Sequence, residues 1–276
     1  MRSWILAALG MLTVSTASAE TGIIFDQPDQ ETDRLVEQCL ETKGVNMLEG
    51  SDVICYNSAI FPEQFLKLNA LPEASRIIIT SPGGNVATAR GMSTILDARG
   101  EPVVIAGQCM SACAMVILPG LDDVHIHHSA HIAVHGITMM DYRTWWGWLK
   151  DDSAPTPMAL MAAQLGYDFG YVLHRSGMDH MVDHLKGQNV EIGYIQQISD
   201  QMFDAALQHD CRVDPKDYWG MVDAGHIQDF LSDRVTRMEA FAQEFEGPNN
   251  RLFRNIAQPI SDQTYIFNSS LSDADC

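Results

Sequence analysis

The sequence predicts an α/β fold built around a mostly parallel sheet. Two short runs rich in β-branched residues, Arg76–Thr80 and Pro102–Ala106, are typical of strands that are buried on both faces. Between them, Val86–Arg99 has the character of a helix, and Gly100 provides its end. A strand, a helix and a second strand at this spacing indicate a βαβ unit with parallel strands.

Further elements extend this alternation in both directions along the chain. Before the unit we expect a helix near Glu31–Glu41, a strand over Asp52–Ile60, and a helix over Pro62–Leu71 that buries Phe65, Leu66 and Leu68. After it we expect a tight connection at Gly107–Met110, a buried helix over Ser111–Leu118, and strands over Val124–His128 and His131–His135. The last third is expected to hold helices at Met158–His174, Gly193–Gln208 and Asp214–Ala224, the last capped by Gly225, a strand at residues 227–229, and a helix at Ser232–Phe245.

The first residues have the pattern of a secretory signal peptide. Arg2 supplies the charge, Trp4–Val14 is the apolar run, and Ala17-Ser18-Ala19 is a small-residue cleavage site. The apolar run is too short to span a bilayer, and no other stretch reaches about 18 apolar residues, so no membrane span is expected. The leader predicts a periplasmic or secreted protein.

The chain is strongly acidic, with a formal net charge of −19 over 276 residues. Removing a leader whose one charge is Arg2 leaves −20. A protein of this charge repels nucleic acid and anionic lipid, so no nucleic-acid partner is expected.

The six cysteines all lie outside the leader, and in an exported protein an even number suggests disulfides. Cys39 with Cys55 is the favoured pair, because these residues flank a short, turn-rich segment. Cys109 and Cys113 do not form a zinc pattern by themselves, since no second pair follows at metal spacing.

Three motifs carry the chemistry of acyl transfer, which needs a nucleophile, a base and donors for an oxyanion. Ser111 lies at a predicted strand-to-helix turn, and His135 ends a later strand. The N–H groups of Gly84, in the turn Ser81-Pro82-Gly83-Gly84, and of Ala112, at a helix start, are the candidate oxyanion donors.

This set resembles the proteolytic subunit of the Clp protease, within the Clp protease/crotonase superfamily. The resemblance covers residues 74–137 and returns faintly near Asp214–Asp229. In the family a Ser-Pro-Gly-Gly turn supplies the oxyanion hole, a Gly-Gln-x-x-Ser segment carries the nucleophile, and a strand ending in His carries the base. Here these are Ser81–Gly84, Gly107–Ser111 and His135, and serine and histidine are 24 residues apart.

The resemblance implies a repeated ββα superhelix and assembly into homo-oligomers. It places the third triad member after a helix, which favours Asp210, with Asp214 as the alternative. It also implies that Cys113 pairs with Cys211, which would tie the nucleophile helix to the acid loop. Since the chain carries a leader, no ATP-driven partner is expected.

The expected domain division is a signal peptide (residues 1–19), an N-terminal extension (20–50), a Clp-protease-like domain (51–231), and a C-terminal helix and tail (232–276). Within the domain, residues 137–157 form an aromatic insert that includes Trp145, Trp146 and Trp148. A lid, an oligomer interface, a wall of the substrate site and ordinary loop packing all stay open for this insert.

Two groups of histidines invite a metal interpretation. His125-x-His127, with His128 and His131 nearby, could serve zinc, but no carboxylate or cysteine completes the group at fixed spacing. His180 and His184 have helical spacing but lack the glutamate of the His-Glu-x-x-His signature, which favours a surface helix. No metal and no cofactor are therefore expected.

The sequence predicts an exported serine hydrolase, most simply a peptidase, that acts on a peptide or ester bond. Ser111 is the nucleophile, His135 the base, Asp210 the orienting acid, and Gly84 and Ala112 the oxyanion donors. The alternative is a catalytically inactive, oligomeric binding or scaffold protein with the same fold. A third hypothesis, crotonase-like thioester chemistry, is disfavoured by export, because acyl-CoA substrates are cytosolic.

Overall fold

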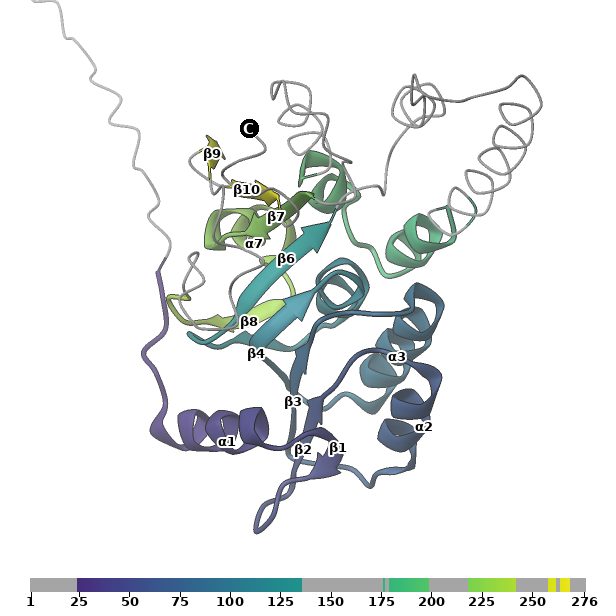
Figure 1. Cartoon of the computed structure of the whole chain (residues 1–276), viewed down its shortest axis with the longest axis vertical. Helices are drawn as coiled ribbons and strands as arrows, with labels where there is room; N and C mark the ends of the chain where they lie inside the picture. The colour runs from purple at the N-terminus through teal and green to yellow at the C-terminus, as the bar shows by residue number, and fades with distance from the viewer. Residues whose placement is uncertain are drawn as a thin grey trace, which may run out of the picture.

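The computed structural model of the protein describes residues 24–135, 176, 179–198, 218–241, 258–261 and 264–268. These residues form a mixed α/β fold around one sheet of ten strands (Figure 1). The predicted α/β class with a mostly parallel sheet is confirmed, whereas the ββα superhelix stays a prediction. No helix in the described ranges is long and apolar enough to cross a bilayer.

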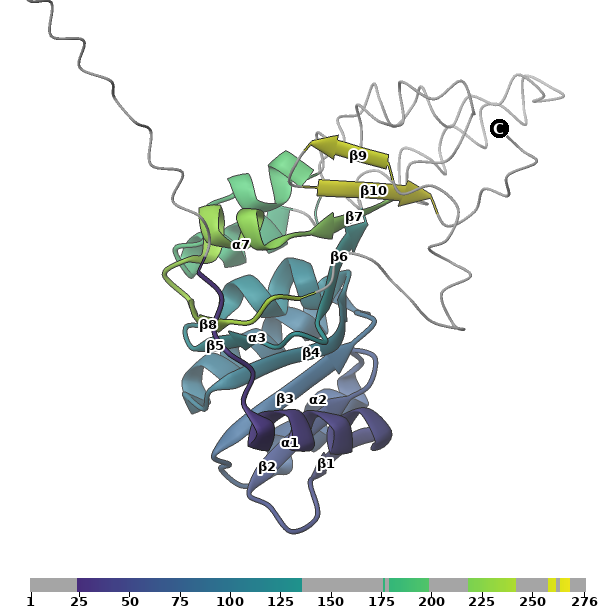
Figure 2. The same ribbon diagram turned by 90° about the vertical axis from the view of Figure 1, so that its left-hand side faces the viewer.

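The sheet has the order β1-β2-β3-β4-β6-β7-β10-β9, and β5 and β8 branch from β4. Its members are β1 (Gly44–Met47), β2 (Val53–Asn57), β3 (Arg76–Ser81), β4 (Val103–Met110), β5 (Val124–Ile126), β6 (His131–His135), β7 (Tyr218–Val222), β8 (Val235–Met238), β9 (Gln258–Ser261) and β10 (Thr264–Asn268). Strands β2, β3, β4 and β6 are parallel neighbours, and β4-β5 and β5-β8 are parallel pairs. Beyond β6 the pairing is antiparallel through β7, β10 and β9 (Figure 2).

Helices cover both faces of the parallel strands. The helical elements include α1 (Gln30–Glu41), α2 (Pro62–Ala70), α3 (Val86–Arg99), the π-helix η1 (Cys113–Ile117), the 3-10 turn η2 (Leu118–Gly120) and α7 (Ala224–Leu231). Helix α1 lies on one side of the sheet, and α2 and α3 lie on the other (Figure 1). Strand β3 shows the result: Ile78 packs in the cluster with α1, and Ile77 and Ile79 pack in the opposite one.

Strand β4 changes partner at a bend. Its first part pairs with β5, and residues Gln108–Met110 pair with β6. The bend lies at Gly107, which has φ 56°, and a side chain there would lie within 2.7 Å of Thr80 Oγ1. Gly107–Met110 is thus part of the strand and not the expected tight connection, and the bend directs the end of β4 toward β6.

Several local predictions in the first half are confirmed. Helix α3 has the predicted bounds, because the Asn85 side chain accepts a hydrogen bond from the Thr88 N–H and Gly100 adopts φ 68°. Cys39 and Cys55 form a disulfide that joins α1 to β2. Leu66 is exposed, contrary to expectation.

The predictions for residues 214–245 are wrong where the structure describes them. Residues 218–222 of the expected helix Asp214–Ala224 form β7, and Gly225, expected to cap the end of that helix, is the second residue of α7. The expected strand at residues 227–229 is part of α7, and the expected helix Ser232–Phe245 contains β8. These short segments form strands because β7 pairs with β6 and β8 pairs with β5.

The signal peptide, the aromatic insert at 137–157 and the helix at Met158–His174 lie outside the described residues. Of the predicted helix Gly193–Gln208, residues 193–198 are described, and they are helical.

Candidate active site

Ser111 lies in the turn between the end of β4 and η1. Its N–H donates to the carbonyl oxygen of Ala133 in β6, at 2.8 Å, and its own carbonyl accepts from the Met115 N–H, at 2.8 Å. These two bonds attach its backbone to the neighbouring strand on one side and to the helix on the other.

The backbone of Ser111 is in the left-handed region, with φ 53°. Few residues other than glycine adopt this conformation, which costs about 1–2 kcal/mol when a Cβ atom is present. A serine on a strained turn between a strand and a helix is the arrangement of the nucleophile elbow, in which the turn presents Oγ to a substrate. Ser111 is 9% exposed.

Gly83 brings the glycine turn directly against Ser111. A Cβ atom at position 83 would lie 2.4 Å from the Met110 carbonyl oxygen, 2.6 Å from Ser111 Cβ and 3.0 Å from the Ala112 backbone nitrogen. Only a residue without a side chain fits here, and Gly83 also has φ 91°. The close approach places the backbone of the turn beside the peptide group that joins Ser111 to Ala112.

The turn itself is fixed from its other side by Ile60. The Ile60 N–H donates to the Gly83 carbonyl at 2.8 Å, and the Ile60 carbonyl accepts from the Asn85 N–H at 2.9 Å. Gly84 has no room for a side chain either, since a Cβ atom would lie 2.4 Å from the Ile60 carbonyl oxygen. Gly84 is therefore held between Ile60 and the start of α3, on a backbone with little freedom to move.

Ala112 immediately precedes η1, where the first N–H groups of a helix lack partners inside that helix. Such groups favour anions. The structure thus brings together Ser111, Ala112 and the Gly83-Gly84 turn. The sequence predicts the nucleophile and both oxyanion donors among these residues.

A disulfide joins the residues on either side of Ser111. Cys109 in β4 and Cys113 at the start of η1 are bonded, with their Cα atoms 5.1 Å apart, and both residues are fully buried. The predicted pairing of Cys113 with Cys211 is wrong, because the turn at Ser111 brings Cys113 within disulfide reach of Cys109. The bond ties together the two ends of the segment that carries Ser111.

The backbone of His135 lies at the end of β6, on the strand that accepts the Ser111 hydrogen bond. Met110 pairs with Ala133, two residues before His135, and His135 pairs with Trp219 of β7. The two candidates, Ser111 and His135, thus lie at the carboxyl ends of the neighbouring parallel strands β4 and β6. Asp210 and Asp214 lie outside the described residues, so the orienting acid stays a prediction.

Comparison with known proteins gives a distant similarity to solved structures and no match by sequence. Neither a family model nor a curated protein matches the sequence. Among solved structures, the chain is similar to a mutant of ClpP1 from Listeria monocytogenes, with a TM-score of 0.36 and 13% sequence identity. The match covers 75% of this chain and 95% of that chain. The chemistry proposed below therefore rests on the geometry around Ser111.

The other histidines singled out in the sequence lie elsewhere. His125, His127 and His128 belong to β5 and the turn after it, and His127 binds Asp33 of α1, on the sheet face opposite α3. His180 and His184 lie on a helix at residues 179–187 that buries Met181 and Leu185, and His180 is exposed.

Sequence reasoning missed three features. Gly83, rather than Gly84, makes the contact with Ser111, and only its place in the Ser-Pro-Gly-Gly turn hinted at this. The Cys109–Cys113 disulfide was missed because spacing alone does not give a pairing. Two carboxylates, from Asp33 and Glu239, adjoin the histidines after β5, and their distance along the chain left no signal.

Proposed function

We propose that the protein is a serine hydrolase that cleaves peptide or ester bonds with Ser111 as its nucleophile. The observation that carries the proposal is the left-handed backbone of Ser111, packed against Gly83 at a strand-to-helix turn. A strained residue of this kind, on a rigid support, is a feature of active sites.

In the proposed reaction, Ser111 Oγ attacks the carbonyl carbon of the substrate while His135 takes its proton. The N–H groups of Gly84 and Ala112 donate to the oxygen that becomes negative, and their fixed backbones let them do so without reorganisation. His135 then gives the proton to the leaving amine or alcohol, which leaves an ester on Ser111. Water cleaves this ester with His135 again as base, which releases the acid and restores the serine.

Asp210 is the proposed third member of the triad, with Asp214 as the alternative. Its carboxylate would hold the tautomer of His135 and stabilise the imidazolium that forms in each half-reaction. An asparagine at the correct position is expected to reduce the rate by a factor on the order of 10⁴, whereas the same change at the other position leaves it near the original value.

The disulfide pairs indicate the cellular compartment in which the protein resides. Two pairs in the described residues are at disulfide distance, which indicates an oxidising compartment. Together with the leader-like sequence at residues 1–19, this supports an exported hydrolase in the periplasm or outside the cell. Assembly into a homo-oligomer is part of the same proposal.

The test is labelling with a fluorophosphonate, read by intact mass. An activated serine displaces fluoride and gains the phosphonyl group, so the wild-type protein is expected to gain one such mass. The Ser111→Ala variant should gain none, and the matched control Ser75→Ala, at an exposed serine, should react at the wild-type rate.

Alanine at position 111 keeps the Cβ atom and hence the same backbone strain, so loss of labelling reports on the hydroxyl. A wild-type protein that is folded and oxidised but does not react contradicts the hydrolase and favours the inactive binding or scaffold protein. Turnover of an acyl thioester without hydrolysis of peptides or esters would favour the crotonase-like alternative.

A further inference from the structure

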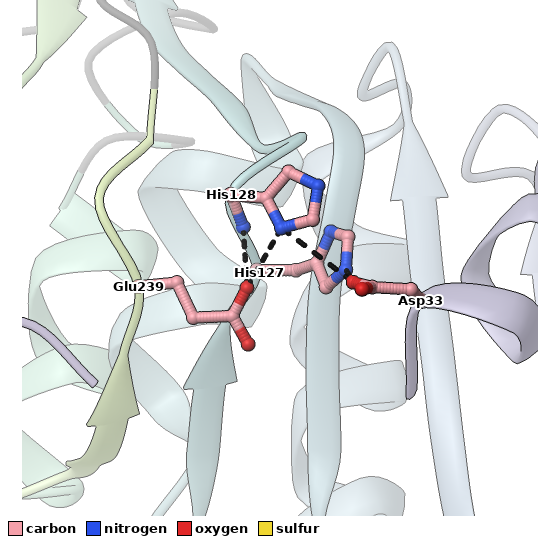
Figure 3. A group of neighbouring side chains, drawn as sticks. All are labelled: Asp33, His127, His128 and Glu239. Carbon is pink, nitrogen blue, oxygen red and sulfur yellow. Dashed lines mark hydrogen bonds and ion pairs between the residues drawn. The ribbon is translucent and has the colours of Figure 1, made fainter. Parts of the chain in front are cut away.

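We propose that Asp33, His127, His128 and Glu239 form a binding site for a divalent transition-metal ion, with zinc as the best-suited ion. The two imidazole rings lie between the two carboxylates (Figure 3). One ligand atom from each of the four side chains lies within 4.8 Å of every other. The site is independent of the proposed hydrolase chemistry.

Three distant parts of the chain meet at this site. Asp33 comes from the first turn of α1, and His127 and His128 come directly after β5. Glu239 follows β8, where its N–H donates to the carbonyl oxygen of Ile126 at 2.9 Å. The parallel pairing of β5 with β8 therefore sets the glutamate beside the two histidines.

The distances between ligand atoms are close to those that a metal needs. His127 Nε2 lies 2.9 Å from Asp33 Oδ1, and His128 Nδ1 lies 2.8 Å from Glu239 Oε2 and 3.6 Å from Asp33 Oδ1. Tetrahedral zinc with bonds of about 2.0–2.1 Å holds its ligand atoms roughly 3.3 Å apart. To admit the ion, the two shortest pairs would widen by about 0.5 Å, and the wider pairs, which lie within 4.8 Å, would contract toward the same spacing.

The glutamate is held in place by a second layer of contacts. Its side chain is fully buried, and Oε1 accepts from His125 Nε2 at 2.8 Å and lies 3.4 Å from an Arg237 guanidinium nitrogen. These contacts leave Oε2 directed at His128. Partners of this kind orient metal ligands and are part of most protein metal sites.

His127 is oriented in the same way. Its ring is 2% exposed, and Nδ1 lies 2.8 Å from Ser129 Oγ, which also accepts from the Gly107 N–H at 3.3 Å. The Ser129 N–H lies 3.2 Å from Nδ1 as well, so Nδ1 is an acceptor here and Nε2 donates to Asp33. Metal binding at Nε2 displaces the ring proton to Nδ1, which then donates to Ser129 Oγ and no longer accepts from the Ser129 N–H.

The charge states also suit a cation. Asp33 and Glu239 contribute two carboxylates, and the Arg237 guanidinium is the cation beside Glu239. Two carboxylates beside one guanidinium leave a net negative charge for the ion to neutralise.

The ligand set points to the class of ion and to its role. Two imidazoles and two carboxylates suit zinc and its first-row neighbours, whereas calcium and magnesium prefer oxygen alone. Four protein ligands close a tetrahedral site, which is the mark of a structural ion. Such an ion would fasten α1 and the segment after β8 to the centre of the sheet, and the half-exposed ring of His128 gives it an entry path.

The experiment uses the full protein without a polyhistidine tag, stripped with EDTA and titrated with zinc chloride. We expect one zinc per chain by elemental analysis, a higher unfolding temperature, and zinc X-ray absorption that fits two imidazoles with oxygen and no sulfur. A protein that remains folded and binds no zinc, or a site with sulfur ligands, overturns the proposal.

Variants separate this site from adventitious binding. His128→Ala and Asp33→Ala, at a half-exposed and a partly exposed side chain, are expected to weaken zinc binding on the order of 100-fold or more, and Ser129→Ala about tenfold. The control His180→Ala, at an exposed histidine on a helix, should bind zinc as the wild type does. Unchanged affinity in both ligand variants, with folding verified by circular dichroism, contradicts the assignment.

Discussion

Replacing Gly83 with alanine is the sharpest test of the contact between the glycine turn and Ser111. The new Cβ atom would lie 2.4 Å from the Met110 carbonyl oxygen and 2.6 Å from Ser111 Cβ, which is about 1 Å short of an ordinary contact. Overpacking of this kind costs about 1–3 kcal/mol. The left-handed backbone at φ 91° adds about 1–2 kcal/mol. Gly83→Ala should therefore lower the free energy of unfolding by roughly 2–5 kcal/mol.

Gly50 provides the matched control. It also has a positive φ, 71°, but a Cβ atom there meets nothing within 4 Å. Gly50→Ala carries the backbone cost alone, partly offset by about 0.4–1 kcal/mol from the less flexible unfolded chain. Urea unfolding with the disulfides intact measures both variants, and the difference between them isolates the contact with Ser111 and Ala112.

The same variant should slow fluorophosphonate labelling, because a displacement of about 1 Å at a reacting group costs on the order of 100-fold in rate. Gly50→Ala should label as the wild type does. The reasoning is refuted if Gly83→Ala and Gly50→Ala have unfolding free energies within about 0.5 kcal/mol of each other and equal labelling rates.

Three further outcomes are expected. Replacing Cys39 and Cys55 together with alanine should lower the free energy of unfolding by about 3 kcal/mol in urea, because their disulfide closes a loop of 16 residues. Replacing Cys109 and Cys113 with serine should slow fluorophosphonate labelling of Ser111 about 10- to 100-fold, because the turn then lacks the disulfide that fixes its two ends. Burial lowers the pKa of His226, so the unfolded chain binds its proton more readily; stability should fall as the pH drops below about 6.5, and less so in His226→Gln.

The fold was predictable where local signals agree with the sheet. The triple isoleucine of β3 has both faces covered, and α3 has a capping asparagine before it and a glycine in the left-handed conformation after it. These features act over a few residues, so the sequence alone reveals them.

The region around β7 and α7 was not predictable in this way. Asp223 caps α7, accepting from the His226 N–H at 2.8 Å, whereas Gly225 looked like the end of an earlier helix. The five residues of β7 are too few for periodicity to separate strand from helix. Their antiparallel pairing with β6 decides the matter, and β6 is more than 80 residues away in the sequence.

The two candidate sites differ in the same respect. The parts around Ser111 could be named because each lies in a short motif at the end of a strand. The histidines after β5 could be seen, but Asp33 lies 94 residues from His127, and Glu239 lies 111 residues from His128. Because Asp33 and Glu239 are distant from the histidines along the chain, the four residues form no short sequence motif. The group becomes visible only in the folded structure.

The backbone of Ser111 departs from what local energetics favour, and its surroundings explain how it persists. Glycine at this position would avoid a cost of about 1–2 kcal/mol but would also remove the hydroxyl. Hydrogen bonds to Ala133 and Met115 fix the residue on either side, and the disulfide between Cys109 and Cys113 closes the turn around it. Strained residues persist when the surrounding contacts fix their conformation, and such residues are concentrated at functional sites. The strained backbone of Ser111 orients its hydroxyl group, and we therefore propose that Ser111 is the nucleophile.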